Sequence, residues 1–153
     1  MKKRILWGIG GVAVIGILAF GYYTISPLFR SVVVNEEAPS GIPNERAAEG
    51  GSAQIVGSTG HPASGNVRVV SAGGKTYLRY ENFKTINGPD LFIYLSNDLD
   101  AKEFVNIGEL KATEGNVNYE VPAGVRVSDF RYALVWCRAF GVLFNFADLS
   151  AAQ

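Results

Sequence analysis

The sequence predicts an all-β protein. We expect an antiparallel, jelly-roll-like β-sandwich of about eight strands, preceded by one N-terminal transmembrane helix. Three observations predict it. Residues 5–25 are uncharged and mostly apolar. After residue 52, short apolar or alternating runs recur roughly every 8–15 residues between Gly, Asn, Asp or Pro, which is typical of sandwiches and barrels. The 18 glycines and six prolines of the 153-residue chain suit a fold with many turns.

The apolar run at residues 5–25 predicts a membrane anchor. At 1.5 Å per residue, a helix of this length spans about 30 Å, the thickness of a hydrocarbon core. Trp7, Tyr22 and Tyr23 stand near its ends, where aromatic side chains favour the interface. Because the basic residues 2–4 stay cytoplasmic, we expect a single-pass cell-membrane protein with its C-terminal domain extracytoplasmic. A cleaved signal peptide is the alternative.

Composition divides the chain into five parts. They are a cytoplasmic basic tail (1–4), the anchor (5–25), a flexible linker (26–51), the β-sandwich domain (52–149) and a tail (150–153). Ten basic and all 14 acidic residues are left once Lys2, Lys3, Arg4 and Arg30, which flank the anchor, are set aside. The part after residue 30 therefore carries about four negative charges, which argues against nucleic acid as a partner.

Eight segments have the pattern of strands. They are residues 53–57, 65–72, 76–83, 91–96, 105–111, 117–121, 133–138 and 142–147. Gly73-Gly74 predicts a tight hairpin. In residues 77–83, Leu78 and Tyr80 share one face, and Arg79 and Glu81 share a face exposed to water. Residues 91–95 are apolar on both faces, which predicts a strand in the middle of a sheet.

Cys137 is the single cysteine of the chain, so no internal disulfide is available. On a strand it shares a face with Ala133 and Val135, while Trp136 and Arg138 share the other face. A cysteine among small apolar residues is an inert core residue by default. The alternatives are a redox thiol, a cofactor ligand or a crosslink to a second molecule.

Other candidate site residues stand in turns. His61, the single histidine, could assist the Cys137 thiol or bind a metal, although its context is that of an exposed loop residue. Asn87 and Asp90 belong to a turn with Gly88 and Pro89, and could line a pocket with Trp136 and Arg138.

The inventory of ligands is too small for most cofactors. The single methionine is Met1, and no Cys-x-x-Cys-His motif occurs. These facts argue against blue copper, Met/His haem and covalent haem. We therefore predict no metal site and no cofactor, with one axial ligand to a non-covalent haem left open.

Several motifs carry a family resemblance. They include His61-Pro-Ala-Ser-Gly65, Asn87-Gly-Pro-Asp-Leu91, Gly115-Asn-Val-Asn-Tyr119 and Val135-Trp-Cys-Arg138. In this order and spacing, residues 52–149 resemble the DM-thirteen (electron-transfer) domain, which also occurs in Skeletor- and Knickkopf-type cuticle proteins. The layout is similar to that of single-domain, membrane-anchored prokaryotic members. Asn145 departs from the pattern, because similar domains often have glycine there.

The resemblance implies a redox function. The family's hallmark cysteine matches Cys137, which would act as a thiol or through a bound group such as haem, with His61 as a possible helper. We expect an electron-transfer role with an unknown redox or envelope protein as partner, and no classical enzyme activity. The alternative is a non-catalytic module of the cell envelope that binds protein or glycan, in which Cys137 merely packs.

Overall fold

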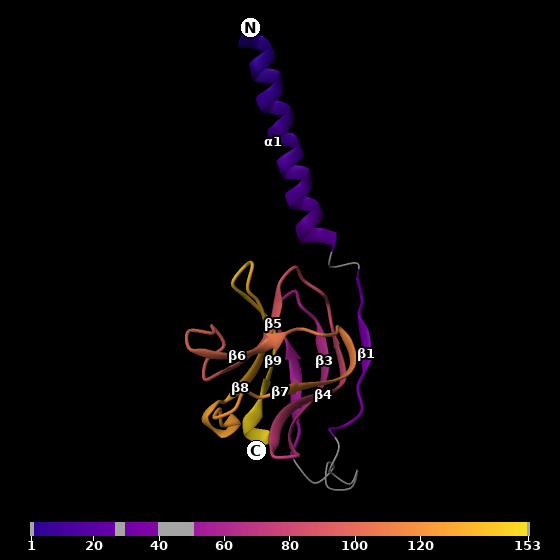
Figure 1. Ribbon diagram of the computed structural model, residues 1–153, viewed down its shortest axis with the longest axis vertical. Helices are drawn as coiled ribbons and strands as arrows, with labels where there is room; N and C mark the ends of the chain where they lie inside the picture. Colours follow the sequence, from indigo (N-terminus) through magenta and orange to yellow (C-terminus); the bar gives the residue numbers. More distant parts are fainter. Residues whose placement is uncertain (1, 27–29, 40–50, 153) are drawn as a thin grey trace.

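The computed structural model describes residues 2–26, 30–39 and 51–152. In these ranges one long helix precedes a domain of nine strands and two short 3₁₀ turns (Figure 1). The elements are α1 (Lys2–Ile25), β1 (Val33–Asn35), β2 (Ala53–Gly57), β3 (Ala63–Ala72), β4 (Lys75–Thr85), β5 (Leu91–Ser96), β6 (Phe104–Glu109), β7 (Glu114–Glu120), η2 (Val127–Asp129), β8 (Tyr132–Cys137), β9 (Val142–Asp148) and η3 (Leu149–Ala151).

The strands form one curled sheet in the order β1-β7-β4-β3-β2-β9-β8-β5-β6. The predicted all-β class is confirmed, but the prediction of two separate antiparallel sheets is wrong. β2 pairs with β3 through Ala53 and Gln54 and with β9 through residues 55–57, so both halves share one strand. The sheet is also mixed, because β1 runs parallel to β7.

All eight predicted strands are present, two of them with the predicted bounds, β2 and β5. The predicted hairpin joins β3 to β4, where Gly73 and Gly74 have φ of 58° and 76°. Glycine adopts such positive φ angles without steric cost. β5 lies between β6 and β8, as its apolar sequence predicted.

The core fills the space between the two halves of the sheet. Its largest fully buried side chains include Tyr80 and Phe83 from β4, Ile93 and Leu95 from β5, and Val135 from β8. Burial raises the pKa of the Tyr80 hydroxyl well above its usual range, and that hydroxyl finds no hydrogen-bond partner among the described residues. The core is thus largely apolar and strongly desolvated.

Asn145 is the polar exception inside this core. Its side chain is 1% exposed, and its Nδ2 donates to Thr85 Oγ1 at 3.0 Å. Asn145 belongs to β9 and Thr85 ends β4, so the bond joins the two halves of the sheet. A buried amide without such a partner would cost about 1–3 kcal/mol.

The N-terminal apolar run forms α1, as predicted, and Figure 1 draws this helix apart from the sheet. Within the described ranges, no helix combines the length and apolarity required to cross a bilayer.

The predicted flexible linker at 26–51 is partly structured. Residues 33–35 form β1 and extend the sheet beyond β7, which the sequence analysis missed. Glu36 continues this contact, because its Oε2 accepts from the Asn118 backbone N–H at 2.7 Å and its Oε1 lies 3.4 Å from Lys111 Nζ. Residues 27–29 and 40–50 of the predicted linker lie outside the described residues.

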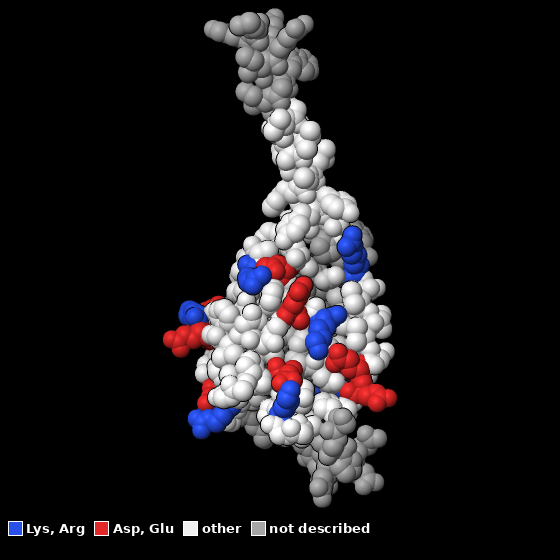
Figure 2. Space-filling view, in the orientation of Figure 1, with Lys and Arg blue, Asp and Glu red and all other residues white. Residues whose placement is uncertain are grey.

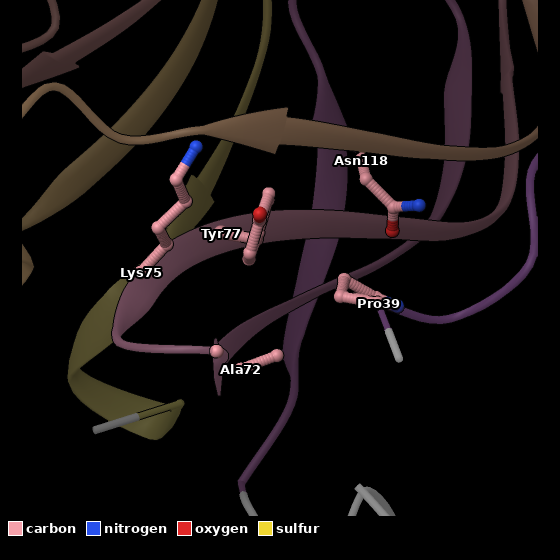
Figure 3. Close-up of a pocket in the computed structure, with 6 residues that line it drawn as sticks. Pro39, Ala72, Lys75, Tyr77 and Asn118 are labelled. Carbon is pink, nitrogen blue, oxygen red and sulfur yellow. The ribbon is translucent and has the colours of Figure 1, made fainter. Parts of the chain in front are cut away.

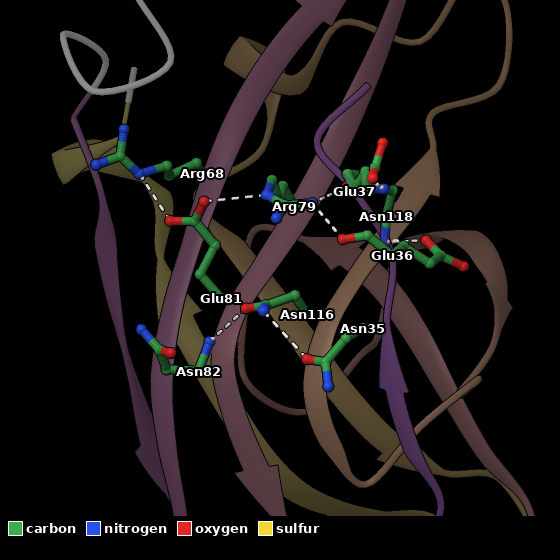
Figure 4. Close-up of polar contacts among 9 residues, drawn as sticks. All are labelled: Asn35, Glu36, Glu37, Arg68, Arg79, Glu81, Asn82, Asn116 and Asn118. Carbon is green, nitrogen blue, oxygen red and sulfur yellow. Dashed lines mark hydrogen bonds and ion pairs between the residues drawn. The ribbon is translucent and has the colours of Figure 1, made fainter. Parts of the chain in front are cut away.

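The β1 segment also covers Arg79, which we had predicted to face water. Arg79 is only 9% exposed. Its guanidinium donates to Glu81, to Asn118 Oδ1 at 2.8 Å and to the Glu36 carbonyl oxygen at 3.3 Å. Figure 4 shows this polar network between the sheet and the segment beside it. The predicted alternation of side chains along β4 was therefore correct, but the predicted exposure of Arg79 to water was wrong.

The predicted tail at 150–153 also belongs to the domain over its described part. Asp148 accepts from the Ser150 backbone N–H and caps η3. Ala152 is 6% exposed and joins the core cluster. The folded unit thus continues to residue 152.

A substitution at Gly115 tests the close contact between β1 and β7. Its φ is 116°, and an added Cβ would overlap the Val34 carbonyl oxygen of β1. We expect Gly115→Ala to lower the free energy of unfolding by about 1–3 kcal/mol more than Gly124→Ala, through overpacking. Gly124 is the matched control, because its φ is 84° but no atom lies within 4 Å of the added Cβ. Equal urea midpoints for the two variants would contradict the close approach of β1.

Candidate functional site

The six predicted site residues gather at one end of the sheet. β8 ends at Cys137, which pairs with Leu91 at the start of β5 and with Val142 at the start of β9. β2 ends at Gly57 of the same end, just before the loop that carries His61. We call this end of the domain the helix-side end, because α1 leaves from it in Figure 1. It is formed by residues 58–62, 86–90, 110–113 and 138–141.

Cys137 is fully buried, with 0% of its surface exposed. It faces the core, as the alternation with Ala133 and Val135 predicted, and it belongs to the hydrophobic core cluster. No hydrogen bond of its sulfur is found with any described residue. In the closed domain, the sulfur therefore packs as a small apolar group and cannot meet an external thiol or disulfide.

His61 is held by other groups than Cys137. Its Nδ1 lies 3.0 Å from Ser58 Oγ, which in turn donates to the Leu143 carbonyl oxygen at 2.5 Å. The imidazole stacks on Phe144, with ring centroids 4.0 Å apart. Phe144 in turn packs against Gly88, where an added Cβ would lie 2.8 Å from its Cζ. The structure thus places His61 and Cys137 at the same end without any hydrogen bond between them among the described residues.

Asp90 and Arg138 form the clearest polar pair of this end. Arg138 Nε donates to Asp90 Oδ2 at 3.0 Å, and Nη2 donates to Oδ1 at 3.3 Å. This hydrogen bonding raises the pKa of the Arg138 guanidinium. The guanidinium also lies 4.1 Å above the centre of the Phe92 ring. Asp90 and Arg138 therefore bind each other and close the turn.

Asn87 connects this end to the chain that follows α1. Its Nδ2 donates to the Arg30 carbonyl oxygen at 3.0 Å, and its Oδ1 accepts from the Gly88 backbone N–H. Both bonds use the amide for structure, as the turn sequence predicted. Asn87 thus holds residue 30 against the loop at 86–90.

The described hollow nearest to His61 along the chain does not fit a non-covalent haem. Ser58 Oγ lies at His61 Nδ1 and Phe144 packs on the face of the ring, so Nε2 is the ring nitrogen left for a ligand. The hollow that follows His61 along the chain has a volume of about 350 Å³, near the lower limit of ligand pockets. It is lined by Pro62, Ala63, Ser64, Lys84, Thr85 and Ile86, which offer no imidazole, thiolate or phenolate as axial ligand. Within the described ranges, no cluster of three or more metal-ligating side chains occurs.

A second hollow lies at the opposite end of the sheet, beside the β3–β4 hairpin. Its volume is about 320 Å³. Figure 3 shows Tyr77, Lys75 and Asn118 around it, with Pro39 of the N-terminal segment on one side. None of the predicted site residues lines either hollow. The pocket that we predicted for Asn87, Asp90, Trp136 and Arg138 is thus distinct from these two hollows and stays a prediction.

Trp136 belongs to an aromatic outer face that the sequence analysis did not identify. On β8, Trp136 pairs with Phe92 of β5 and with Leu143 of β9. Two residues before it, Leu134 pairs with Tyr94 of β5 and with Phe146 of β9. All of these side chains point away from Cys137, because alternate residues of a strand face opposite sides. The members of this outer face are Val56, Phe92, Tyr94, Phe104, Tyr132, Leu134, Trp136, Leu143 and Phe146. The apolar pattern on both faces of β5 was the signal that could have revealed it.

Charged side chains are mostly paired across strands. Figure 2 shows acidic and basic residues interspersed on the face that it draws, without a large region of one sign. Examples are Lys75 with Glu120 and Lys84 with Glu114. Such paired, exposed charges contribute little to stability and do not form the basic stripe that attracts nucleic acid.

Comparison with known proteins identifies one family. The family described as Electron transfer DM13 matches residues 55–149, which include Cys137, His61 and the whole curled sheet from β2 to β9 apart from two residues of β2. No curated protein and no solved structure matches the chain.

The burial of Cys137 predicts unequal costs for two small replacements. We expect Cys137→Ser to lower the free energy of unfolding by about 1–3 kcal/mol, because its hydroxyl would be buried among apolar side chains. Cys137→Ala should cost less, since it removes one atom and buries no polar group. Urea unfolding of both variants measures the difference. A serine variant as stable as the alanine variant would contradict the apolar surroundings.

Proposed function

We propose that this chain, which belongs to the Electron transfer DM13 family, is a membrane-anchored redox domain of the cell envelope whose redox centre is Cys137. The family match carries the proposal, because it covers the folded domain and contains the only cysteine. The burial of Cys137 adds a condition: its chemistry requires the helix-side end to open.

We propose anchoring by residues 5–25 from the apolar sequence and from the exposed apolar side chains of α1, although the described part of the chain contains no helix long and apolar enough to cross a membrane. The side chains of Val12, Ile15, Ile17 and Leu18 are each more than 65% exposed. These four positions point around the helix rather than to one side, since successive residues are about 100° apart. A helix that is apolar all round is stable where it is surrounded by protein or lipid. Lipid is the surrounding that we propose.

The position of Cys137 favours local opening over global unfolding. It is the last residue of β8, and the turn that follows is exposed. Strand ends open more readily than strand centres. In the open form, the Cys137 thiolate would attack a disulfide of a partner. A mixed disulfide between Cys137 and the partner forms, and the partner's second sulfur leaves as a thiolate; the partner is fully reduced only when an external thiol attacks Cys137 Sγ in this mixed disulfide and releases the partner's first sulfur. Because the chain has one cysteine, it can form one mixed disulfide at a time, and an external thiol is needed to break it.

Reversible oxidation of the full chain in lipid nanodiscs tests this function. Oxidised glutathione should add to Cys137 without denaturant, and a reducing thiol should remove the adduct. Because the sulfur is buried, the domain must open locally before the reaction. An opening free energy of about 3 kcal/mol would make adduct formation about 100-fold slower than in the urea-unfolded chain. Intact-mass spectrometry follows the adduct, and Cys137→Ala is the blank. An adduct that forms only after unfolding rejects Cys137 as the redox centre.

A second candidate function is an interaction module, and the aromatic outer face favours it. Sheet faces that meet water normally alternate polar side chains with buried apolar ones. Here Val56 on β2 and Phe104 on β6 are both 46% exposed, and Trp136 on β8, between these two strands, is partly exposed. Apolar patches of this kind often mark binding surfaces. Protein and glycan are the two ligand classes that we propose for it.

Two substitutions separate the two functions. Val56→Lys and Phe104→Lys place charge on the outer face, whereas Cys137 keeps its position in the core. If the outer face binds an envelope partner, cross-linking of the full chain to that partner should decrease about tenfold or more in the variants, while glutathione addition to Cys137 is unchanged. Unchanged cross-linking would reject the outer face as the binding surface.

A further inference from the structure

The helix-side end of the domain carries a group of exposed apolar side chains. Phe140 and Val142, in and after the β8–β9 turn, are 49% and 38% exposed. Val32 and Val33, at the start of the β1 segment, are 44% and 59% exposed. Single exposed apolar residues are common, but here four of them lie at the helix-side end, because Val142 pairs with Cys137, the Val32 carbonyl oxygen accepts from the Thr113 backbone N–H, and Val33 pairs with Glu114.

The pairing of the strands and one hydrogen bond fix this arrangement. The turn at 138–141 follows Cys137, which pairs with Leu91, directly after the loop at 86–90. Asn87 of that loop binds the Arg30 carbonyl oxygen at 3.0 Å. Residue 30 comes five residues after the end of α1. The turn and the end of α1 are therefore on the same side of the domain.

Two ion pairs neutralise charged side chains of this end. Arg138, two residues before Phe140, forms a bidentate pair with Asp90. Lys84 lies 3.7 Å from Glu114. The chain beyond residue 30 carries more acidic than basic residues, so an anionic surface would repel the domain. The exposed apolar side chains are therefore the attraction that we consider for a neutral surface at this end.

We propose that the Phe140 turn inserts into the headgroup region of a lipid bilayer and seats the domain on the membrane. This inference rests on the proposed anchoring by residues 5–25. Aromatic side chains favour the boundary between headgroups and hydrocarbon. Gly141, with φ of 61°, closes the turn tightly and leaves Phe140 at its tip. Cys137 then lies within three residues of the membrane surface, so the end that must open for its chemistry faces the lipid.

Site-specific labelling of the full chain in nanodiscs of zwitterionic lipid tests the insertion. Phe140→Cys is labelled with a polarity-sensitive fluorophore, and Phe104→Cys is the matched control. Phe104 is exposed to nearly the same extent, 46%, but it pairs with Ser96 at the opposite end of the sheet. A brief reaction labels the new cysteine, because Cys137 is 0% exposed; the wild-type chain treated in the same way is the blank.

We expect the fluorescence emission of the label at residue 140 to be blue-shifted relative to that of the label at residue 104. Brominated lipid should quench the label at residue 140 at least about twice as strongly as the label at residue 104. Equal quenching at both positions, in a chain that stays with the lipid after an alkaline wash, overturns the insertion and leaves the anchor intact. Release of the chain by the wash, with both labels in water, overturns the anchor and the insertion together. Circular dichroism of both variants confirms that they fold.

Discussion

β2 changes its pairing partner along its length, and this change determines how the two halves of the sheet are arranged. Ala53 and Gln54 pair with β3, whereas residues 55–57 pair with β9. One short strand thus belongs to both halves, and the sheet must bend there to bring its inner faces together. Gly65 makes the bend possible nearby, because its φ is 113° and an added Cβ would meet the carbonyl oxygens of Glu81 and Asn82 at 2.7–2.8 Å. The register of β3 and β4 shifts between Ser64 and Asn66, so the ladder is irregular at this point.

The bend explains why Cys137 is shielded. Curling turns one face of every strand inward, and Cys137 is on that face together with Val135. The same alternation sends Trp136 and Arg138 outward, where Arg138 binds Asp90 and stacks on Phe92. A redox role for the sulfur and its complete burial are compatible only if the domain opens at this end. The hydrogen bond between Asn145 and Thr85 opposes such opening deeper in the core, so strand ends are the favoured place for it.

The segment before the domain is part of its stability as well as its connection to α1. β1 covers the edge of β7, and an open edge would otherwise offer unpaired N–H and C=O groups to other chains. Glu36 adds a carboxylate to that edge, and its carbonyl oxygen accepts from the buried Arg79. The segment after α1 is also held by Asn87 at the helix-side end. These contacts favour a defined orientation of the domain relative to the chain that precedes it.

The strands, the Gly73-Gly74 hairpin and the inward direction of Cys137 could be predicted from the amino-acid pattern, because they depend on local backbone preferences and on the alternation of side chains. The family could be predicted from the order and spacing of short motifs. The fold was needed to show that β2 joins the two halves, that β1 adds to β7, that Arg79 is covered and that His61 packs on Phe144. Each of these is a contact between residues distant in sequence, and its geometry depends on how the whole sheet curls. Burial of the sulfur likewise follows from closure of the sheet rather than from any property of residues 133–137.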